Sequence, residues 1–213
     1  MTTLEWVMSR KIIAIVRGLK PEYMVALAEA LYKGGIDLME VTFDQKHPDT
    51  WKDTAGAIRA IGDHMKGRML PGAGTVLTPE QLGMARDAGA AYIITPNTNP
   101  ELIRQVKAYG LAAFPGACTP SEIEAAWEAG ADAVKVFPAG TLGIGYIKAV
   151  KAPLSHIPLM AVGGVNEKNC AEFIAAGCCG VGVGGSLVNK DWIMNGEWDR
   201  ITAAAAGFRK AVG

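Results

Sequence analysis

The sequence lacks an excess of charge of either sign, since 21 lysine and arginine residues balance 21 aspartate and glutamate residues. It has neither a basic stripe of the kind that binds nucleic acid nor an acidic tail of the kind that stays disordered. Long hydrophobic runs are also missing, because the longest apolar stretches are only as long as a β-strand. We therefore expect no nucleic-acid partner and no membrane-spanning segment.

Cysteine and histidine are scarce and do not cluster with metal-ligand spacing. They are Cys118, Cys170, Cys178, Cys179, His47, His64 and His156. We expect free thiols, surface histidines and no metal-dependent mechanism. The first six residues lack the basic-then-apolar order of a secretory signal. Together with the unpaired cysteines, this predicts a protein of the reducing cytoplasm.

Short apolar segments recur along the 213 residues, and their starts are spaced by about 20 to 30 residues. The predicted strands are residues 11–17, 36–43, about 68–75, 91–95, 111–114, a segment within 131–140, 159–162 and 180–184. Eight β-then-α units without a break in composition predict one domain, residues 1–213, folded as a closed parallel (β/α)8 barrel after a short N-terminal helix. An open doubly wound sheet is the alternative.

Capping signals mark several of the predicted helices. Residues 78–81 and 119–122 each combine an N-cap threonine, a proline at the first position and a Gln or Glu capping-box partner. Asn99 and Asn166 are predicted to cap two further helices. The last helix, rich in alanine, is predicted to run to about residue 209.

The strand within residues 131–140 carries one lysine, Lys135. Side chains alternate across a strand, so Ala133, Lys135 and Phe137 share a face. Parallel strands are buried on both faces, which would place Lys135 inside the protein. Loss of hydration there lowers the pKa of the amine and makes it a nucleophile for carbonyl carbon. A lysine on an exposed edge strand is the alternative interpretation.

Polar residues gather near the C-terminal ends of strands, where barrel enzymes hold their catalytic groups. They are Arg17, Glu40, Thr75 and Lys135. Three charges in one barrel mouth are costly unless each has a partner or a substrate. The structural alternatives are a Glu40–Lys135 salt bridge, an Arg17 that only neutralises Glu40, and a Thr75 that simply suits a strand.

Glycines follow the last two predicted strands, where barrels commonly bind phosphate through backbone N–H groups. They are Gly163, Gly164, Gly184 and Gly185, with Ser186 next to them. Tight strand–helix packing is the alternative reason for these glycines. The spacing alone predicts a phosphate-bearing carbonyl substrate and aldol cleavage through a Schiff base. The competing hypotheses are a phosphate-binding isomerase or synthase without a covalent lysine adduct, and a non-catalytic barrel that senses a sugar phosphate.

Seven segments, in the same order along essentially the whole chain, resemble the class I aldolases for 2-keto-3-deoxy-6-phosphogluconate (KDPG) and 4-hydroxy-2-oxoglutarate (KHG). They are residues 13–17 (Ile-Ala-Ile-Val-Arg), 39–42 (Met-Glu-Val-Thr), 72–77 (Gly-Ala-Gly-Thr-Val-Leu), 114–116 (Phe-Pro-Gly), 134–139 (Val-Lys-Val-Phe-Pro-Ala), 162–165 (Val-Gly-Gly-Val) and 184–186 (Gly-Gly-Ser).

The resemblance implies that Lys135 forms the Schiff base and that Glu40 is the general acid/base, acting through water. It also implies that Thr75 and Arg17 receive the pyruvate carboxylate, that Phe137 walls the pocket and that the glycine loops hold the phosphate. The family is usually trimeric and needs no cofactor, so a homotrimer without a cofactor is expected.

Three positions depart from the gluconate-type pattern. Asp44 stands where many such members carry an arginine, and Val162 stands where they tend to have threonine. Residues 95–97 (Thr-Pro-Asn), with Pro96 expected at the substrate, are more like the branch that acts on 2-keto-3-deoxy-6-phosphogalactonate. The two sugar acids differ at one hydroxyl, so the resemblance leaves the choice between gluconate and galactonate open.

Overall fold

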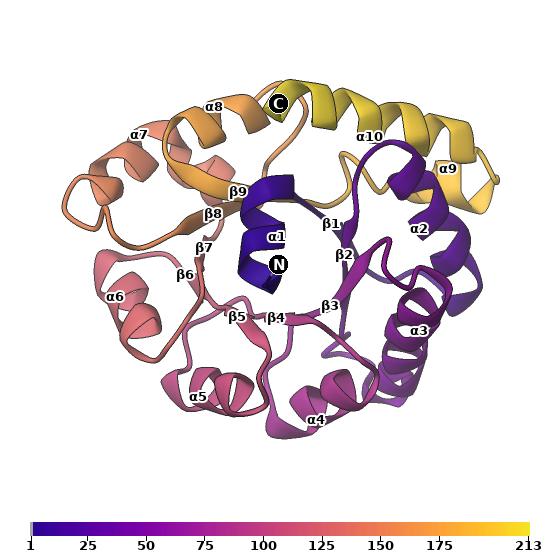
Figure 1. Ribbon diagram of the computed structural model, residues 1–213, viewed down its shortest axis with the longest axis horizontal. Helices are drawn as coiled ribbons and strands as arrows, with labels where there is room; N and C mark the ends of the chain where they lie inside the picture. The colour runs from indigo at the N-terminus through magenta and orange to yellow at the C-terminus, as the bar shows by residue number, and fades with distance from the viewer. Residues whose placement is uncertain (1) are drawn as a thin grey trace.

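A computed structural model describes residues 2–213, in which nine strand segments form one parallel sheet curled into a ring (Figure 1). In sheet order they are β5 (Ala112–Phe114), β4 (Tyr92–Ile94), β3 (Leu70–Gly74), β2 (Leu38–Thr42), β1 (Ile12–Val16), β9 (Cys178–Val183), β8 (Leu159–Val162), β7 (Val134–Val136) and β6 (Gly116–Ala117).

The ring closes at Pro115, between β5 and β6. β5 corresponds to the fifth predicted strand, residues 111–114, and β6 continues it beyond its predicted end. Pro115 separates the two segments because proline has no N–H to donate. The N–H of Asp132 donates to the carbonyl of Ala113 at 2.9 Å, and that of Lys135 to the carbonyl of Pro115 at 2.8 Å. Hydrogen bonds from the segment that contains β7 therefore reach both β5 and Pro115, and they close the ring. The predicted eight-unit barrel is confirmed, and the doubly wound alternative is wrong.

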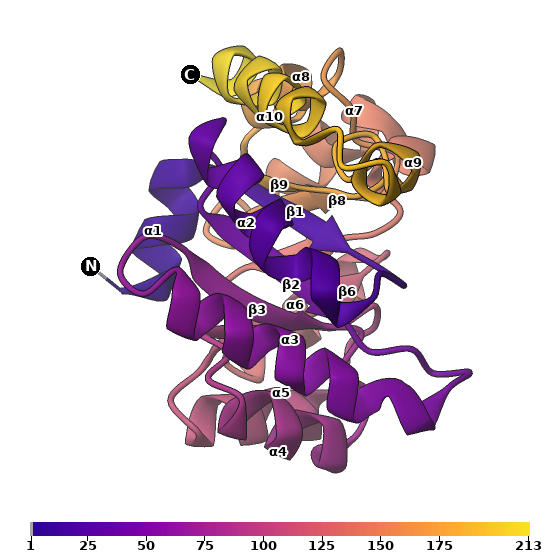
Figure 2. The same cartoon turned by 90° about the vertical axis from the view of Figure 1, so that its right-hand side faces the viewer.

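The helices surround the ring, except for α1, which lies across the end from which the strands start (Figures 1 and 2). They are α1 (Thr3–Arg10), η1 (Pro21–Tyr23), α2 (Met24–Lys33), η2 (Pro48–Thr50), α3 (Trp51–His64), α4 (Pro79–Asp87), α5 (Pro100–Ala108), α6 (Pro120–Glu128), α7 (Ala139–Lys151), α8 (Cys170–Ala175), α9 (Lys190–Met194) and α10 (Trp198–Val212).

The capping predictions are confirmed at three helices. Thr78 and Thr119 form complete capping boxes, and the Asn99 side chain accepts hydrogen bonds from two backbone N–H groups at the start of α5. The prediction for Asn166 is wrong, because α8 begins only at Cys170. Asn166 instead turns the chain locally, with its side chain accepting from the N–H of Lys168 at 2.9 Å.

The end of the chain also differs from its prediction. The segment after β9 contains the short helix α9 before α10, and α10 continues to Val212 rather than ending near residue 209. Gly196, at φ 70°, reverses the chain between the two helices.

The core has an outer part, between the strands and the surrounding helices, and an inner part that fills the ring. The inner part consists of Val7, Ile13, Leu38, Tyr92, Ile94, Ala112, Phe114, Ala133 and Met160. Val7 comes from α1, so this helix seals the N-terminal end of the barrel. The C-terminal end is thereby the open one, as in other barrels of this kind.

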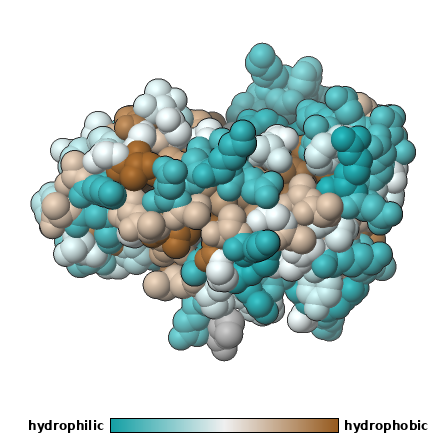
Figure 3. Space-filling view, turned by 90° about the horizontal axis from the view of Figure 1, so that it is seen from above, coloured by the Kyte–Doolittle hydropathy of each residue, from teal (hydrophilic) through white to brown (hydrophobic). Residues whose placement is uncertain are grey.

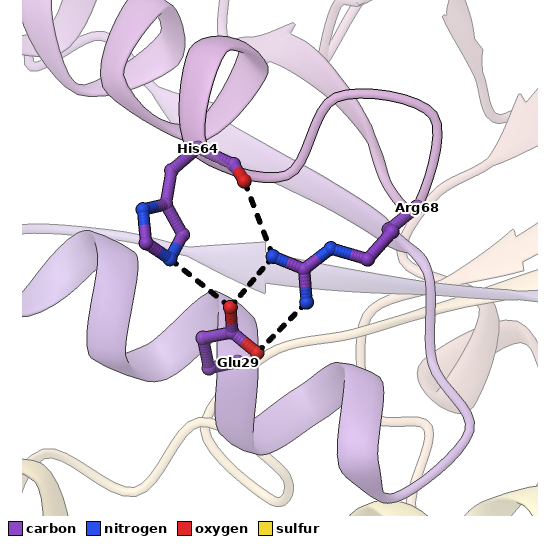
Figure 4. Close-up of polar contacts among 3 residues, drawn as sticks. All are labelled: Glu29, His64 and Arg68. Carbon is purple, nitrogen blue, oxygen red and sulfur yellow. Dashed lines mark hydrogen bonds and ion pairs between the residues drawn. The ribbon is translucent and has the colours of Figure 1, made fainter.

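His64 belongs to a surface cluster that joins α2 to the end of α3 (Figure 4). The Glu29 carboxylate accepts hydrogen bonds from Arg68 at 2.7 and 3.1 Å, and His64 Nε2 lies 3.0 Å from Glu29 Oε1. The Arg68 guanidinium lowers the pKa of Glu29. The cluster lies on the outside of the barrel wall, so we interpret it as a brace between two helices.

The outer surface is mixed, and Figure 3 shows apolar side chains dispersed among hydrophilic ones on the face seen from above. In the described part of the chain, no helix has both the length and the apolar character needed to cross a bilayer. The cysteines of residues 2–213 are free thiols, and the three histidines are exposed as expected. Burial raises the pKa of Cys178 to about 12 and that of Cys179 to about 11, which keeps both thiols protonated and unreactive.

Candidate active site

A cavity of about 440 Å³ opens at the C-terminal ends of the strands, where ten of the eleven predicted site residues meet. These residues are Arg17, Glu40, Pro96, Lys135, Phe137, Gly163, Gly164, Gly184, Gly185 and Ser186. They come from loops and strands that are far apart in sequence but adjacent around the ring. Of the four polar residues predicted to share the barrel mouth, Arg17, Glu40 and Lys135 line this cavity and Thr75 does not.

Lys135 lies inside the barrel, on β7, with 7% of its surface exposed. Its backbone is bonded to both neighbouring strands, in register with Gly116 and Met160, so the edge-strand alternative is wrong. Burial lowers the pKa of the amine, the Glu40 carboxylate opposes this effect, and the Arg17 guanidinium adds to it. The Nζ atom lies 4.9 Å from the centre of the Phe137 ring, which is 38% exposed and forms a wall of the cavity.

Glu40 is 1% exposed and points from β2 into the ring. Its carboxyl group fills the space above Gly74, where any side chain would collide with it. Gly74 is therefore required for Glu40 to face inward. Burial raises the pKa of Glu40, and the positive charges of Lys135 and Arg17 counteract the rise.

No ion pair or hydrogen bond joins Glu40 to Lys135 or to Arg17 within residues 2–213. The Oε2 atom of Glu40 has no hydrogen-bond partner among these residues. The first structural alternative, a Glu40–Lys135 salt bridge, is thus wrong. Arg17 acts on Glu40 through its charge, as the second alternative holds, but it also donates a hydrogen bond to Thr75. A buried amine with a lowered pKa and a buried carboxyl with a raised pKa share one cavity, an arrangement suited to proton transfer at a reacting carbonyl.

Thr75 lies outside the lining of this cavity. It follows β3 with φ 55°, a left-handed conformation that is rare for a β-branched residue. Its hydroxyl accepts a hydrogen bond from Arg17 at 3.3 Å, and its carbonyl accepts one from Gln45 at 2.8 Å. The prediction that Thr75 lies within strand 68–75 is corrected, since the strand ends at Gly74. Thr75 contacts the site through Arg17, which lines this cavity and also a smaller neighbouring one of about 240 Å³ that Thr75 lines.

The glycines of the two loops have different structural reasons. Gly163 and Gly164 have φ 86° and 76°, and Gly164 packs against Gly140, so backbone conformation and packing account for them. Gly185 has no left-handed φ, and a Cβ there would meet nothing within 4 Å. In the described chain, the backbone N–H groups of Gly185 and Ser186 have no acceptor. Backbone conformation and packing therefore account for glycine in the first loop, where the N–H groups of Gly163 and Gly164 also have no acceptor among the described residues. No packing neighbour accounts for Gly185, which leaves room for an anion in front of the second loop.

The structure adds residues that the sequence analysis did not place at the site. Ile15, Val165 and Asn166 line the cavity, and so does Val162, which was singled out only as a departure from the gluconate-type pattern. Asp44 does not line it; it borders the smaller cavity that Thr75 also lines. The inward alternation of β1 and β8 could have identified Ile15 and Val162, because each lies two residues from another inward position.

Fold and site together define a (β/α)8 barrel with a buried lysine–carboxyl pair at its open end. A family model described as KDPG and KHG aldolase matches residues 4–204, so the chain belongs to this family and is an enzyme, a carbon–carbon lyase. The resemblance inferred from the seven segments is confirmed.

Individual relatives agree with this assignment. The chain is 38% identical over 210 residues to the 2-dehydro-3-deoxy-6-phosphogalactonate aldolase of Escherichia coli (strain K12), covering 98% of this chain and 100% of that protein. A solved structure described as native KDPGal is 40% identical with a TM-score of 0.84, covering 94% of this chain and 93% of the other. A KDPG aldolase from Legionella pneumophila, with pyruvate captured as a covalent carbinolamine intermediate, is 28% identical with a TM-score of 0.87, covering 97% and 98%.

Proposed function

We propose that this enzyme is a class I aldolase that cleaves a 2-keto-3-deoxy-6-phospho-sugar acid to pyruvate and glyceraldehyde 3-phosphate. The observation that carries the proposal is the buried Lys135 amine, with its lowered pKa, in one cavity with the buried Glu40 carboxyl. The covalent pyruvate adduct in the Legionella relative supports the same chemistry.

Each step of the proposed cycle has a group that performs it. The neutral Lys135 amine adds to the keto carbon, and loss of water gives an iminium ion that withdraws electrons. Glu40, directly or through water, removes the proton of the C4 hydroxyl as the C3–C4 bond breaks, and the electron pair moves into an enamine. The carboxyl then returns a proton to C3 of the enamine, and water releases pyruvate from the lysine.

Charged ends of the substrate are proposed to bind at opposite parts of the cavity. Arg17 is the cation beside Lys135 in the described lining, and its bond to Thr75 orients it, so this pair would hold the pyruvate carboxylate. The loop of Gly184, Gly185 and Ser186 would bind the phosphate through its backbone N–H groups. Phe137 and Pro96 wall the space between the two ends, and the loop of Gly163 and Gly164 shapes its floor.

The galactonate-type substrate is supported by the relatives, which are 38% and 40% identical. Val162 in the cavity wall supports a relaxed choice between the epimers. Valine offers no hydroxyl to select the configuration of one substrate hydroxyl. We expect both phosphorylated epimers to be cleaved, the galactonate epimer no more slowly than the gluconate epimer. KHG, which lacks a phosphate, should be cleaved more slowly. Comparison of kcat/KM for the three substrates measures this preference, and a strong preference for the gluconate epimer would contradict it.

Gly185→Ala tests the phosphate loop. A methyl group fits there without strain, since it would meet nothing within 4 Å, and it takes up space beside the unpaired N–H groups of the loop. We expect KM for the phosphorylated substrates to rise roughly ten-fold, about 1.4 kcal/mol, with little effect on KHG cleavage. The matched control is Gly145→Ala, since Gly145 also has open space around it but lies in α7. If Gly185→Ala weakened KHG cleavage equally, the loop would not be a phosphate site.

The proposal also includes the assembly and location of the enzyme. We propose that residues 1–213 act as one barrel domain, that the barrels form a cytoplasmic homotrimer, and that no cofactor takes part. Support for these statements comes from the family resemblance. Light scattering of the purified protein tests the trimer directly, and a monomer in solution would contradict it.

Borohydride trapping tests the proposed function as a whole. Incubation with pyruvate and borohydride should add a reduced pyruvate group irreversibly at Lys135, detected by peptide mass spectrometry. An isomerase or synthase that uses its lysine electrostatically, or a barrel that only senses a sugar phosphate, would bind ligand without this adduct. An unmodified Lys135 under conditions that trap a known class I aldolase would refute the proposal.

A further inference from the structure

Three buried oxygen atoms have no hydrogen-bond partner among residues 2–213: Glu40 Oε2, Tyr92 Oη and Asp37 Oδ1. Asp37 is already paired with Arg10 through its other oxygen, whereas Glu40 and Tyr92 have no polar partner at all. The Tyr92 side chain is 0% exposed and is one of the largest side chains of the inner core. Buried polar atoms in folded proteins are nearly always hydrogen-bonded, because the loss of water is otherwise not compensated. The proposed cycle uses Glu40 but gives Tyr92 no role.

The strand register places the two side chains next to each other. Glu40 is paired with Gly72, and Gly72 is paired with Tyr92, so the three residues lie at one level across β2, β3 and β4. The Tyr92 ring covers Gly72, and the Glu40 carboxyl covers Gly74, two residues further along the same face of β3. Two residues of a strand span about 6.6 Å, so the phenol lies directly beneath the carboxyl, toward the sealed end of the barrel.

The charged groups around this pair leave the phenol as a donor. The charges of Lys135 and Arg17 act on Glu40, and those of Glu40 and of Asp37, which is paired with Arg10 at 2.9 Å, act on Tyr92. Burial raises the pKa of Tyr92 well above its ordinary value, and the negative charges of Glu40 and Asp37 raise it further. The hydroxyl therefore stays protonated and can donate a hydrogen bond at any working pH.

We propose that Tyr92 is a positioning residue for Glu40, and that its hydroxyl donates through one buried water molecule to the unpaired carboxyl oxygen. No direct bond joins the two groups in the described residues. One water bonded to both groups would satisfy both oxygens. This bond holds the carboxyl in the rotamer that reaches the substrate and favours its ionised form. Its effect on catalysis rests on the proposed function, whereas its effect on Glu40 titration does not.

Tyr92→Phe removes the hydroxyl and keeps the ring above Gly72 and its packing against Phe114, whose ring centre lies 5.7 Å away. We expect kcat to fall about ten-fold while KM changes by less than about two-fold, because substrate still binds but the proton carrier is misplaced. The pKa of Glu40 should move upward, because its charged form loses a donor. Carbon-13 NMR of labelled glutamate carboxyls measures this titration directly, with Glu40→Gln assigning the resonance.

The controls separate the hydroxyl from packing and from the proposed function. Phe114→Leu disturbs the same ring without removing a polar group, so it should lower thermal stability and leave the Glu40 titration in place. Should Phe114→Leu move that titration as far as Tyr92→Phe does, or should Tyr92→Phe move neither kcat nor the titration, the proposal is overturned. In the latter case, loss of an uncompensated hydroxyl should also raise stability. If the wild-type protein forms no adduct in the borohydride test but Tyr92→Phe still shifts the Glu40 titration, the proposed function falls and the Tyr92 contact stands.

Discussion

Lys135→Met is expected to yield a folded protein that forms no pyruvate adduct and has lost activity by roughly 10⁴-fold or more. Methionine matches the length of the lysine stem and suits an interior position, but its thioether cannot add to a carbonyl. Steady-state cleavage of the phosphorylated substrates and mass spectrometry after borohydride treatment measure the two losses. Lys135→Ala should give the same catalytic result and leave a larger cavity.

The matched control is Lys52→Met, on the exposed side of α3, which should retain the wild-type rate and the adduct. Substantial activity in Lys135→Met would show that another group performs the chemistry. An adduct on a different lysine in the wild-type protein would contradict the assignment just as directly.

Removal of Lys135 should also change the pH dependence of stability. Burial lowers the pKa of this amine from its ordinary 10.5. The free energy of unfolding of the wild-type protein is therefore highest above the ordinary pKa, where the amine is neutral in both states, and it decreases as the pH falls through the lowered pKa of the folded state. Methionine carries no such dependence. The difference in melting temperature in favour of Lys135→Met should therefore widen as the pH is lowered.

Glu40→Gln is expected to lower kcat by about 10²- to 10⁴-fold while substrate still binds. The carboxamide has the shape of the carboxyl that occupies the space above Gly74, so the site keeps its form, but it cannot carry a proton. The adduct with pyruvate at Lys135 should still form. Single-turnover cleavage, KM and borohydride trapping together distinguish lost proton transfer from lost binding.

The charge of Glu40 gives this variant a second readout. The carboxylate raises the pKa of Lys135, so replacing it with an amide should lower that pKa further and extend trapping to lower pH. Glu124→Gln, on the exposed side of α6, is the matched control and should change neither rate nor pH dependence. Wild-type turnover in Glu40→Gln would remove Glu40 from the mechanism.

Local sequence patterns predicted most of the elements that position the site. The two-residue alternation of the strands turned Lys135 and Glu40 inward, and the capping boxes at Thr78 and Thr119 marked the starts of α4 and α6. Asn166 misled the prediction, since asparagine suits a turn as well as a cap. Only the hydrogen bonds between backbone N–H groups and the Asn166 and Asn169 side chains distinguish the two.

The sequence could not predict which side chains from different strands lie next to one another. Thr75 had the spacing of a cavity residue, but its left-handed backbone directs it to Arg17 and away from the Lys135 cavity. The closeness of Tyr92 to Glu40 depends on the register of three strands and on the absence of a side chain at Gly72.

The sequence by itself determined the number and order of the βα units and the family, because periodicity, caps and short motifs are local properties of the chain. It also determined which ionisable side chains face inward. Only the tertiary structure decided which of them meet, which glycines leave room for an anion, and that Glu40 and Lys135 share a cavity without forming an ion pair. The physical reason is that burial, pKa and hydrogen-bond partners depend on neighbours from distant segments, and closure of the barrel is what brings those segments together.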